Sequence, residues 1–140
     1  MAHNITNVDM YNEITSDDMD VIFTQLLPHL FQDMEHPGCI TTDYKTGPSG
    51  RPQISYRGTK YYISVLLALN NMRKRYPDYK LVPGFEGSHW KCNNPPCVNE
   101  KHLVLEMEDV NKSRLCCKIY GKFKNYRCPH LPVCPGCDPI

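Results

Sequence analysis

The sequence predicts a small α+β domain in which metal sites supplement a modest hydrophobic core. Its 140 residues suffice for one such core and are too few for two independent ones. Seven of the eight cysteines lie in the second half of the chain, with histidines at short intervals among them. Between two segments with helical spacing lies a segment whose residues alternate as in a β-strand.

The N-terminal region, residues 1–38, is predicted to be acidic and helical. Ser16 is a candidate N-cap, and acidic residues follow it in the first turn. Apolar residues then lie close to helical spacing: Ile22, Leu26, Leu27 and Leu30. Pro28 should kink this helix or split it into two short ones. We expect this region to pack against residues 39–140 or to contact a second copy of the chain.

Residues 51–63 predict a β-hairpin with a turn near Arg57-Gly58, and residues 64–76 predict a helix that ends before Pro77. On the first strand, alternate residues share one face: Arg51, Gln53, Ser55 and Arg57. Such side chains can read bases in a DNA major groove, because Arg suits guanine, Gln suits adenine and Ser suits either. An ordinary solvated strand face explains the same pattern equally well.

Charge is divided unevenly along the chain. Residues 1–44 hold eight acids and no Lys or Arg, whereas the remaining 96 residues hold all 16 bases and seven acids. Six bases and no acid lie between Lys112 and Arg127. This basic part favours a nucleic acid as partner over simple solvation. No apolar run is long enough to span a membrane and no secretion signal is evident, so we expect an intracellular, reducing environment.

In a reducing environment, eight cysteines favour metal sites over disulfides. A C-x4-C-x4-H triplet of Cys92, Cys97 and His102 suits tetrahedral zinc. Its fourth ligand must come from elsewhere, and Cys39 is the one cysteine outside the second half of the chain. Buried free thiols are the alternative interpretation.

A second candidate metal site lies near the C-terminus. It combines Cys128, His130 and Cys134 with either Cys116 or Cys117, and Cys137 competes for the same role. With four protein ligands each, both sites would be closed, so we expect two structural zinc ions that stabilise loops in a domain with a small core.

His89 and Asn111 belong to neither candidate zinc site. His89 lies three residues before Cys92 on a predicted strand, and Asn111 lies on a helix predicted over residues 108–115. An imidazole there could act as the general base that deprotonates water for attack on a phosphodiester. The Asn oxygen could hold a hard cation such as Mg²⁺ on the scissile phosphate. Taken singly, each is better explained in a simpler way, His89 as a surface histidine and Asn111 as part of a polar helix face.

Three segments carry a resemblance to a known family: "SHWKCNNPPCVNEKHL", "DVNKSRLCC" and "CPHLPVC". They resemble the zinc-binding His-Cys box homing endonucleases, which belong to the wider His-Me finger, or HNH-like, nucleases with a ββα-metal active site. The match covers roughly residues 39–134, and the ligand spacings agree through several consecutive elements. Residues 1–38 are not covered.

The resemblance implies roles for individual residues. It implies one zinc ion at Cys39, Cys92, Cys97 and His102, and a second at Cys117, Cys128, His130 and Cys134. It implies that His89 is the general base and Asn111 the sole protein ligand of a catalytic Mg²⁺, for which other divalent cations can substitute. Arg51 would lie beside the scissile phosphate. The major-groove-reading positions would be Gln53, Ser55 and Arg57.

Two departures from the family pattern matter. The family usually has His-x-Cys where this chain has two residues between His89 and Cys92. One extra residue in a strand would reverse the facing of its side chains unless a bulge absorbs it. The sequence also stops six residues after Cys134, so we do not expect the long C-terminal arm that joins dimers in some relatives. A homodimer would then use another interface.

The resemblance implies a Mg²⁺-dependent, site-specific endonuclease of double-stranded DNA that leaves 5′-phosphate and 3′-hydroxyl ends. The expected partner is duplex DNA, a second copy of the chain is a candidate partner in a homodimer, and no membrane is expected. The protein would act in the nucleus or wherever its target DNA resides. The alternative is a non-catalytic, zinc-scaffolded DNA-binding regulator derived from such a nuclease, which would need neither His89 nor Asn111. A zinc-stabilised module that binds proteins through the acidic helix is a third hypothesis.

Overall fold

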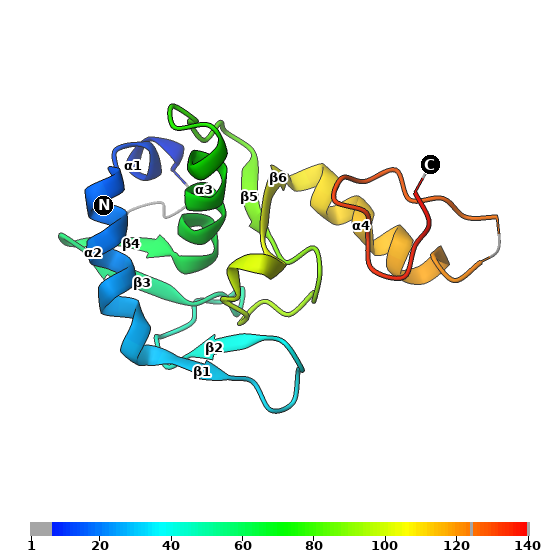
Figure 1. Ribbon diagram of the computed structural model, residues 1–140, viewed down its shortest axis with the longest axis horizontal. Helices are drawn as coiled ribbons and strands as arrows, with labels where there is room; N and C mark the ends of the chain where they lie inside the picture. The colour runs from blue at the N-terminus through cyan, green and yellow to red at the C-terminus, as the bar shows by residue number, and fades with distance from the viewer. Residues whose placement is uncertain (1–6, 124, 140) are drawn as a thin grey trace.

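The computed structural model describes residues 7–123 and 125–139, so Lys124, one of the six bases noted above, lies outside it, as do residues 1–6 of the acidic region. The described residues form a mixed α/β fold with three short antiparallel sheets, each of two strands. Figure 1 shows a main body containing the first three helices, from which helix α4 and the C-terminal loops project to one side. This agrees with the small mixed fold that the sequence predicts.

The N-terminal helices are α1 (Val8–Asn12) and α2 (Ser16–Leu26). Thr15, rather than the predicted Ser16, is the N-cap of α2. Its hydroxyl accepts from the backbone N–H of Asp18, and the Asp18 carboxylate accepts from the backbone N–H of Thr15, which forms a capping box. The reason is that an N-cap needs an extended backbone, which Thr15 adopts, whereas Ser16 is already helical.

The kink or split predicted at Pro28 is instead the end of the helix: α2 stops at Leu26, and no second α-helix follows directly. Pro28 lies in a single 3₁₀ turn (Leu27–His29), after which the chain becomes strand β1 (Leu30–Gln32). This strand pairs with β2 (Ile40–Thr42). The hairpin therefore spans the boundary between the acidic region, residues 1–38, and residues 39–140. The apolar residues at positions 26, 27 and 30 have helical spacing and therefore predict a helix. A three-residue strand is too short to show the alternating pattern that would distinguish it from a helix.

The predicted hairpin is formed by β3 (Gln53–Tyr56) and β4 (Thr59–Tyr62). Its two-residue turn is Arg57-Gly58, and both residues have positive φ, 50° and 78°. Such a turn matches the twist of the flanking strands, which explains the choice of Gly58. Tyr56 donates a hydrogen bond to Asp18 (2.6 Å) and thereby fastens the hairpin to α2. This hydrogen bond, with those from Thr15, lowers the pKa of Asp18 to about 2.

Helix α3 (Ile63–Arg75) forms the centre of the core, and its first seven residues are all buried. One apolar cluster contains side chains from α1, α2, β3, β4, α3 and β6, so the N-terminal helices and the rest of the body share a core. Strand β5 (Phe85–Ser88) approaches α3 very closely at Gly87. A Cβ there would lie 2.9 Å from the backbone carbonyl of Ser64, so this position requires glycine.

The third sheet and the last helix form a ββα unit. Strand β5 pairs antiparallel with β6 (Val104–Met107), and α4 (Glu108–Tyr120) begins at the next residue. The connection between β5 and β6 carries a 3₁₀ turn (Glu100–His102), and a non-helical segment follows α4. Among the described residues, no helix has the length and apolar character needed to span a membrane.

Candidate functional site: two metal clusters and a polar centre on the ββα unit

The first Cys/His cluster joins the β1–β2 hairpin to the loop between β5 and β6. Its four ligand atoms lie within 4.8 Å of one another, and they belong to Cys39, Cys92, Cys97 and His102. His102 presents Nδ1 to the sulfurs, at 3.7 Å from Cys39 and 3.5 Å from Cys97. Hydrogen bonding from the Cys92 thiol, together with backbone N–H groups, lowers the pKa of Cys97 to about 4. Three sulfurs and one imidazole nitrogen this close together fit a closed structural zinc site with four protein ligands.

Backbone contacts hold this first cluster in place. The Val98 N–H donates to the Ile40 carbonyl (2.7 Å), and the Asn99 amide donates to the Gly38 carbonyl (2.7 Å). These bonds bring Cys39 to the other three ligands, which lie more than fifty residues further along the chain. Of the ligands, Cys92 alone is half-exposed.

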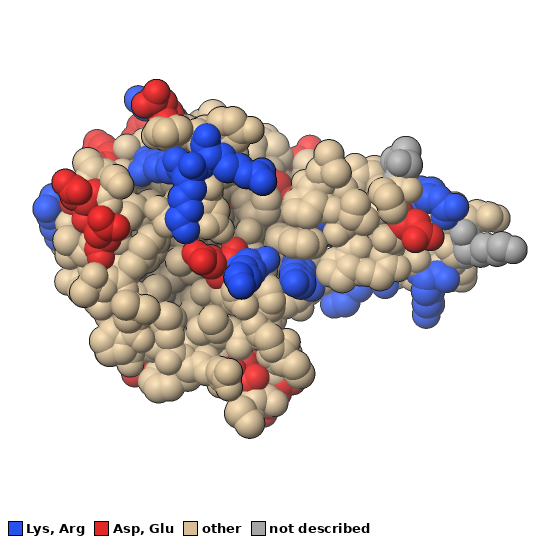
Figure 2. All heavy atoms as spheres, viewed as in Figure 1, with Lys and Arg blue, Asp and Glu red and all other residues tan. Residues whose placement is uncertain are grey.

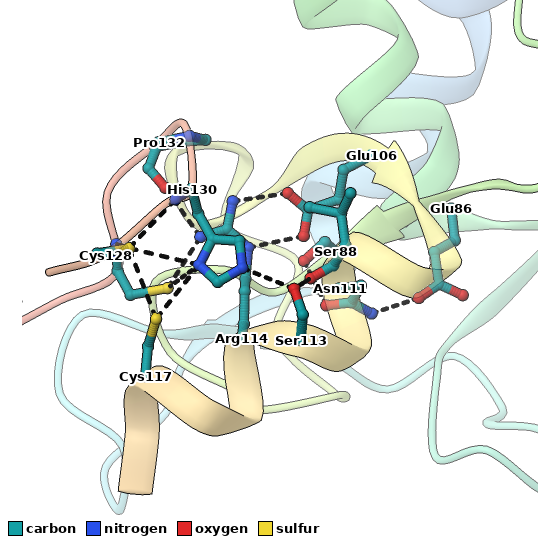
Figure 3. Close-up of polar contacts among 12 residues, drawn as sticks. Glu86, Ser88, Glu106, Asn111, Ser113, Arg114, Cys117, Cys128, His130 and Pro132 are labelled. Atoms are coloured by element: carbon teal, nitrogen blue, oxygen red, sulfur yellow. Dashed lines mark hydrogen bonds and ion pairs between the residues drawn. The ribbon is translucent and has the colours of Figure 1, made fainter. Parts of the chain in front are cut away.

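The second cluster closes the segment after α4. Its ligand atoms also lie within 4.8 Å of one another and come from Cys117, Cys128, His130 and Cys134, all buried. Figure 3 shows the His130 ring directed at the sulfurs of Cys117 and Cys128, with Nδ1 at 3.3 and 3.4 Å. Backbone N–H groups of Cys134 and His130 donate to the Cys128 sulfur and lower its pKa to about 6, against the effect of burial.

Cys117 rather than Cys116 belongs to this second cluster. The Cys116 side chain is exposed, because it lies one position away on the helix and points elsewhere. Cys137 also lies outside the four ligands; it is half-buried, and its sulfur lies near the Cys117 carbonyl oxygen at 3.8 Å. The four residues fit a second structural zinc ion.

Two side chains of α4 connect the second cluster to the ββα unit. Ser113 Oγ lies 2.6 Å from His130 Nε2 and donates to the Val110 carbonyl, so it accepts from the ring and fixes the tautomer that leaves Nδ1 for the metal. Arg114, fully buried, donates to the Cys134 sulfur (3.1 Å) and forms a two-pronged ion pair with Glu106 on β6, at 2.7 and 2.6 Å. The guanidinium thus balances thiolate charge and joins the second cluster to the strand. Spacing alone did not reveal either contact.

His89 follows β5 directly and is buried. Its Nε2 lies 2.9 Å from the Cys97 carbonyl oxygen. Because a carbonyl can only accept, Nε2 carries the hydrogen and the neutral ring has its lone pair on Nδ1. Burial lowers the pKa of His89, the hydrogen bond to Cys97 opposes this, and the nearby Arg51 cation lowers it further. The imidazole is therefore neutral at physiological pH and has a free base nitrogen.

The extra residue between His89 and Cys92 lies in a turn. The strand ends at Ser88, residues 90–92 form a turn, and the Asn93 N–H donates to the His89 carbonyl at 2.9 Å. Asn93 adopts a positive φ of 51°, which Asn tolerates better than most residues. The extra residue therefore lies outside the strand and does not reverse the facing of the strand's side chains.

Asn111, on the first turns of α4, is held from both sides by β5 (Figure 3). Its Oδ1 accepts from the Ser88 hydroxyl at 2.6 Å, and its Nδ2 donates to the Glu86 carboxylate. Because Ser88 precedes His89, the Asn111 contact lies one residue from the imidazole. Glu86 and Ser88 were not identified from the sequence, and no motif there distinguishes them from ordinary strand residues.

Arg51 belongs to the same centre. Its guanidinium lies 4.0 Å from the same Glu86 oxygen that contacts Asn111. Arg51 and Glu86 are each about one-quarter exposed or less and line a pocket of about 280 Å³ beside β5. Arg51 and Asn111 therefore meet at one carboxylate, and Ser88, the residue before His89, joins them through Asn111.

The strand face predicted for base reading is only partly regular. Gln53 is half-buried, with its amide packed over Gly47, and Ser55 is exposed, whereas the intervening Ile54 is buried. Arg57 departs from this face because it lies in the turn. Its guanidinium lies 3.4 Å from Asp18 and 5.0 Å from the centroid of the Tyr56 ring.

Charge is distributed unevenly over the surface as well. On the face shown in Figure 2, basic side chains gather over α3 and along the end that carries α4, whereas acidic side chains lie over the N-terminal helix α2. The last turn of α3 contributes Arg73, Lys74 and Arg75.

Comparison with known proteins agrees with this geometry. A family model described as the zinc-binding loop region of homing endonuclease matches residues 34–137, which include all eight cluster ligands, His89 and Asn111. Neither the curated proteins nor the solved structures contain a match to the chain. The matched region spans most of the sequence and contains the ββα unit with both clusters. The chain therefore belongs to the His-Cys box homing endonuclease family.

Proposed function

We propose that this protein is a Mg²⁺-dependent endonuclease that hydrolyses double-stranded DNA at a specific site, with His89 as general base. The observation that carries the proposal is that Glu86 lies against both Arg51 and Asn111, while Asn111 also accepts from Ser88, the residue before His89. Membership of the homing endonuclease family supports DNA as the substrate. The excess of bases after residue 44 supports it too, because phosphate contacts dominate affinity for DNA.

His89 is suited to activating water. The Cys97 carbonyl fixes Nε2 as the donor, so Nδ1 can accept a proton from water as its oxygen attacks phosphorus. Cys97 is itself a cluster ligand, so the first zinc site would fix the direction of the imidazole. The bond between phosphorus and the 3′ oxygen breaks, and that oxygen takes up a proton from solvent. One fragment then carries a 5′-phosphate and the other a 3′-hydroxyl.

Asn111 is suited to holding the cation. A carboxamide oxygen has two lone pairs, and the Ser88 hydroxyl uses one of them, so the other remains available to a hard cation. Magnesium bound there would stabilise charge on the scissile phosphate and on the leaving oxygen. Arg51, with its guanidinium beside the same centre, would bind a non-bridging phosphate oxygen. Gln53, Ser55 and Arg57 would contact base edges, the last after leaving Asp18.

The test is plasmid cleavage by the zinc-loaded protein. With Mg²⁺ we expect nicked or linear product whose ends can be religated without further treatment, because ligation requires 5′-phosphate and 3′-hydroxyl ends. We expect no product when EDTA is added for a brief assay, which removes free Mg²⁺ and leaves the zinc ions bound. His89→Ala should retain zinc and DNA binding but cleave about 10²–10⁴-fold more slowly. His36→Ala, which alters an exposed histidine, is the matched control. Tight DNA binding without cleavage by the wild-type protein would instead support the non-catalytic regulator.

A further inference from the structure

Glu86 is a part-buried carboxylate to which the family resemblance gives no role. It lies on β5, two residues before Ser88, and its Oε1 receives a hydrogen bond from Asn111 Nδ2. The same oxygen lies 4.0 Å from Arg51. Its side chain is one-quarter exposed, so the carboxylate is accessible to the surface pocket beside β5.

The hydrogen bonds around Asn111 allow one orientation of its amide. A carboxylate can only accept, so the atom of Asn111 that faces Glu86 must be the NH₂ group. The oxygen is thereby turned toward Ser88, whose hydroxyl donates to it. Rotating the amide by half a turn would place its oxygen against the carboxylate, which is repulsive. Glu86 thus determines which end of Asn111 is presented to a cation.

We infer that Glu86 is the positioning residue of the cation site: it holds Asn111 by the amide nitrogen, so that Oδ1 faces the metal, and it keeps Arg51 beside that site. This inference rests on the proposed function, because it assigns a role within the same centre. The inference extends the proposed function, because Asn111 alone, as a neutral side chain free to rotate, would be a weak ligand. A negative charge nearby also increases the affinity for a divalent cation.

A purely structural role for Glu86 makes different predictions from a positioning role. If it only supported the fold, removing it would reduce stability or zinc content and leave the Mg²⁺ requirement unchanged. If it positions Asn111, its removal should weaken the response to Mg²⁺. DNA binding should be unchanged or stronger, since a carboxylate that competes with phosphate for Arg51 is lost.

The experiment compares Glu86→Gln and Glu86→Ala with Glu35→Gln, which alters an exposed carboxylate in the loop between β1 and β2. Plasmid nicking is measured over a range of Mg²⁺ concentrations, beside zinc content, melting temperature and duplex binding. A hydrogen bond to a charged group contributes about 1.5–3 kcal/mol, which corresponds to about 10- to 150-fold in an equilibrium constant. We expect the half-saturating Mg²⁺ concentration to rise by that factor in Glu86→Ala and less in Glu86→Gln, which keeps an acceptor. Glu35→Gln should match the wild type.

A second measurement does not depend on cleavage. The Asn111 side-chain amide is observed by NMR in the zinc-loaded protein and assigned by its loss in Asn111→Asp. In the wild type its two protons should be widely separated in shift, and Mn²⁺ should broaden them. In Glu86→Ala the separation should shrink, and broadening should need about tenfold more Mn²⁺.

The outcomes separate the two proposals. Wild-type nicking with the same Mg²⁺ dependence in all three variants would overturn the role of Glu86 and leave the endonuclease standing. A zinc-loaded wild-type protein that binds DNA but nicks at no Mg²⁺ concentration would overturn the endonuclease, and the role of Glu86 with it. If both Glu86 variants bind less zinc or melt at a lower temperature, and the folded fraction responds to Mg²⁺ as the wild type does, Glu86 only stabilises the fold.

Discussion

A buried imidazole that already donates one hydrogen bond has a single nitrogen left for proton transfer. In His89 this is Nδ1, because Nε2 donates to the Cys97 carbonyl. A general base works only when neutral, and burial lowers the pKa of His89 below its ordinary value of about 6.5. As the proposed general base, His89 would therefore stay neutral to a lower pH than a free imidazole.

At this residue scale we predict the pH dependence of cleavage. The single-turnover rate at saturating Mg²⁺ should be nearly constant between about pH 7 and 8 and should fall only as the pH drops below about 6.5, where the imidazole becomes protonated. The measurement is plasmid nicking in overlapping buffers, with zinc content checked at each pH. A rate that keeps rising tenfold per pH unit through pH 8 would show that another group is the base.

At the scale of elements, α4 connects the candidate cation ligand to the second metal cluster. Asn111 faces β5, Ser113 contacts His130, and Arg114 joins Cys134 to Glu106. Three side chains within four residues thus fix one helix to a strand on one side and to a metal cluster on the other (Figure 3). A change in the second cluster should therefore alter the position of Asn111.

Arg114→Ala should demonstrate this connection. Removing one partner of a buried ion pair leaves an uncompensated charge on Glu106 and costs about 3–5 kcal/mol of unfolding free energy. We expect that loss in denaturant titrations, together with slower cleavage. Arg75→Ala, at an exposed position on α3, should change stability by no more than about 0.5 kcal/mol. Equal stability of the two variants would contradict the account of α4.

Local patterns in the sequence predicted some of these elements well. The β3–β4 hairpin with its Arg57-Gly58 turn and helix α3 follow from alternation, turn residues and helical spacing, all of which act over a few residues. The two metal clusters followed from ligand spacing and the family resemblance. Contacts between distant segments did not follow, because no spacing rule relates Glu86 to Asn111 or Ser113 to His130. The β1–β2 hairpin was not predicted, because strands of three residues are too short to show an alternating pattern.

At the scale of the whole molecule, the two clusters stabilise regions of different kinds. The first lies against the body, whose apolar cluster draws on α1, α2, α3 and three strands. Around the second, the buried core of the described residues consists of Cys117, Cys128 and Cys134, with only partly buried neighbours. The described part of the C-terminal segment therefore buries little apolar surface of its own, so we expect its fold to depend on a metal ion at the second cluster.

Selective loss of the second zinc ion should consequently unfold only one end of the molecule. We expect Cys134→Ser to bind one zinc per chain instead of two and to become sensitive to protease after α4, while the body keeps a melting temperature near that of the wild type. Cys116→Ser, which alters an exposed thiol outside the cluster, should keep both zinc ions. Metal analysis and limited proteolysis decide this. Cooperative unfolding of the whole chain in Cys134→Ser would contradict it.

The central claim is that His89, Asn111 and Arg51 act on one phosphodiester. The most direct measurement is a crystal structure of the zinc-loaded protein with duplex DNA and Mn²⁺ in place of Mg²⁺, in which anomalous scattering locates the manganese. We predict Mn²⁺ bound directly to Asn111 Oδ1, with the same phosphate in reach of Arg51 and facing His89 Nδ1. Manganese absent from Asn111 while DNA occupies the hairpin, or a His89 ring directed away from that phosphate, would contradict the claim.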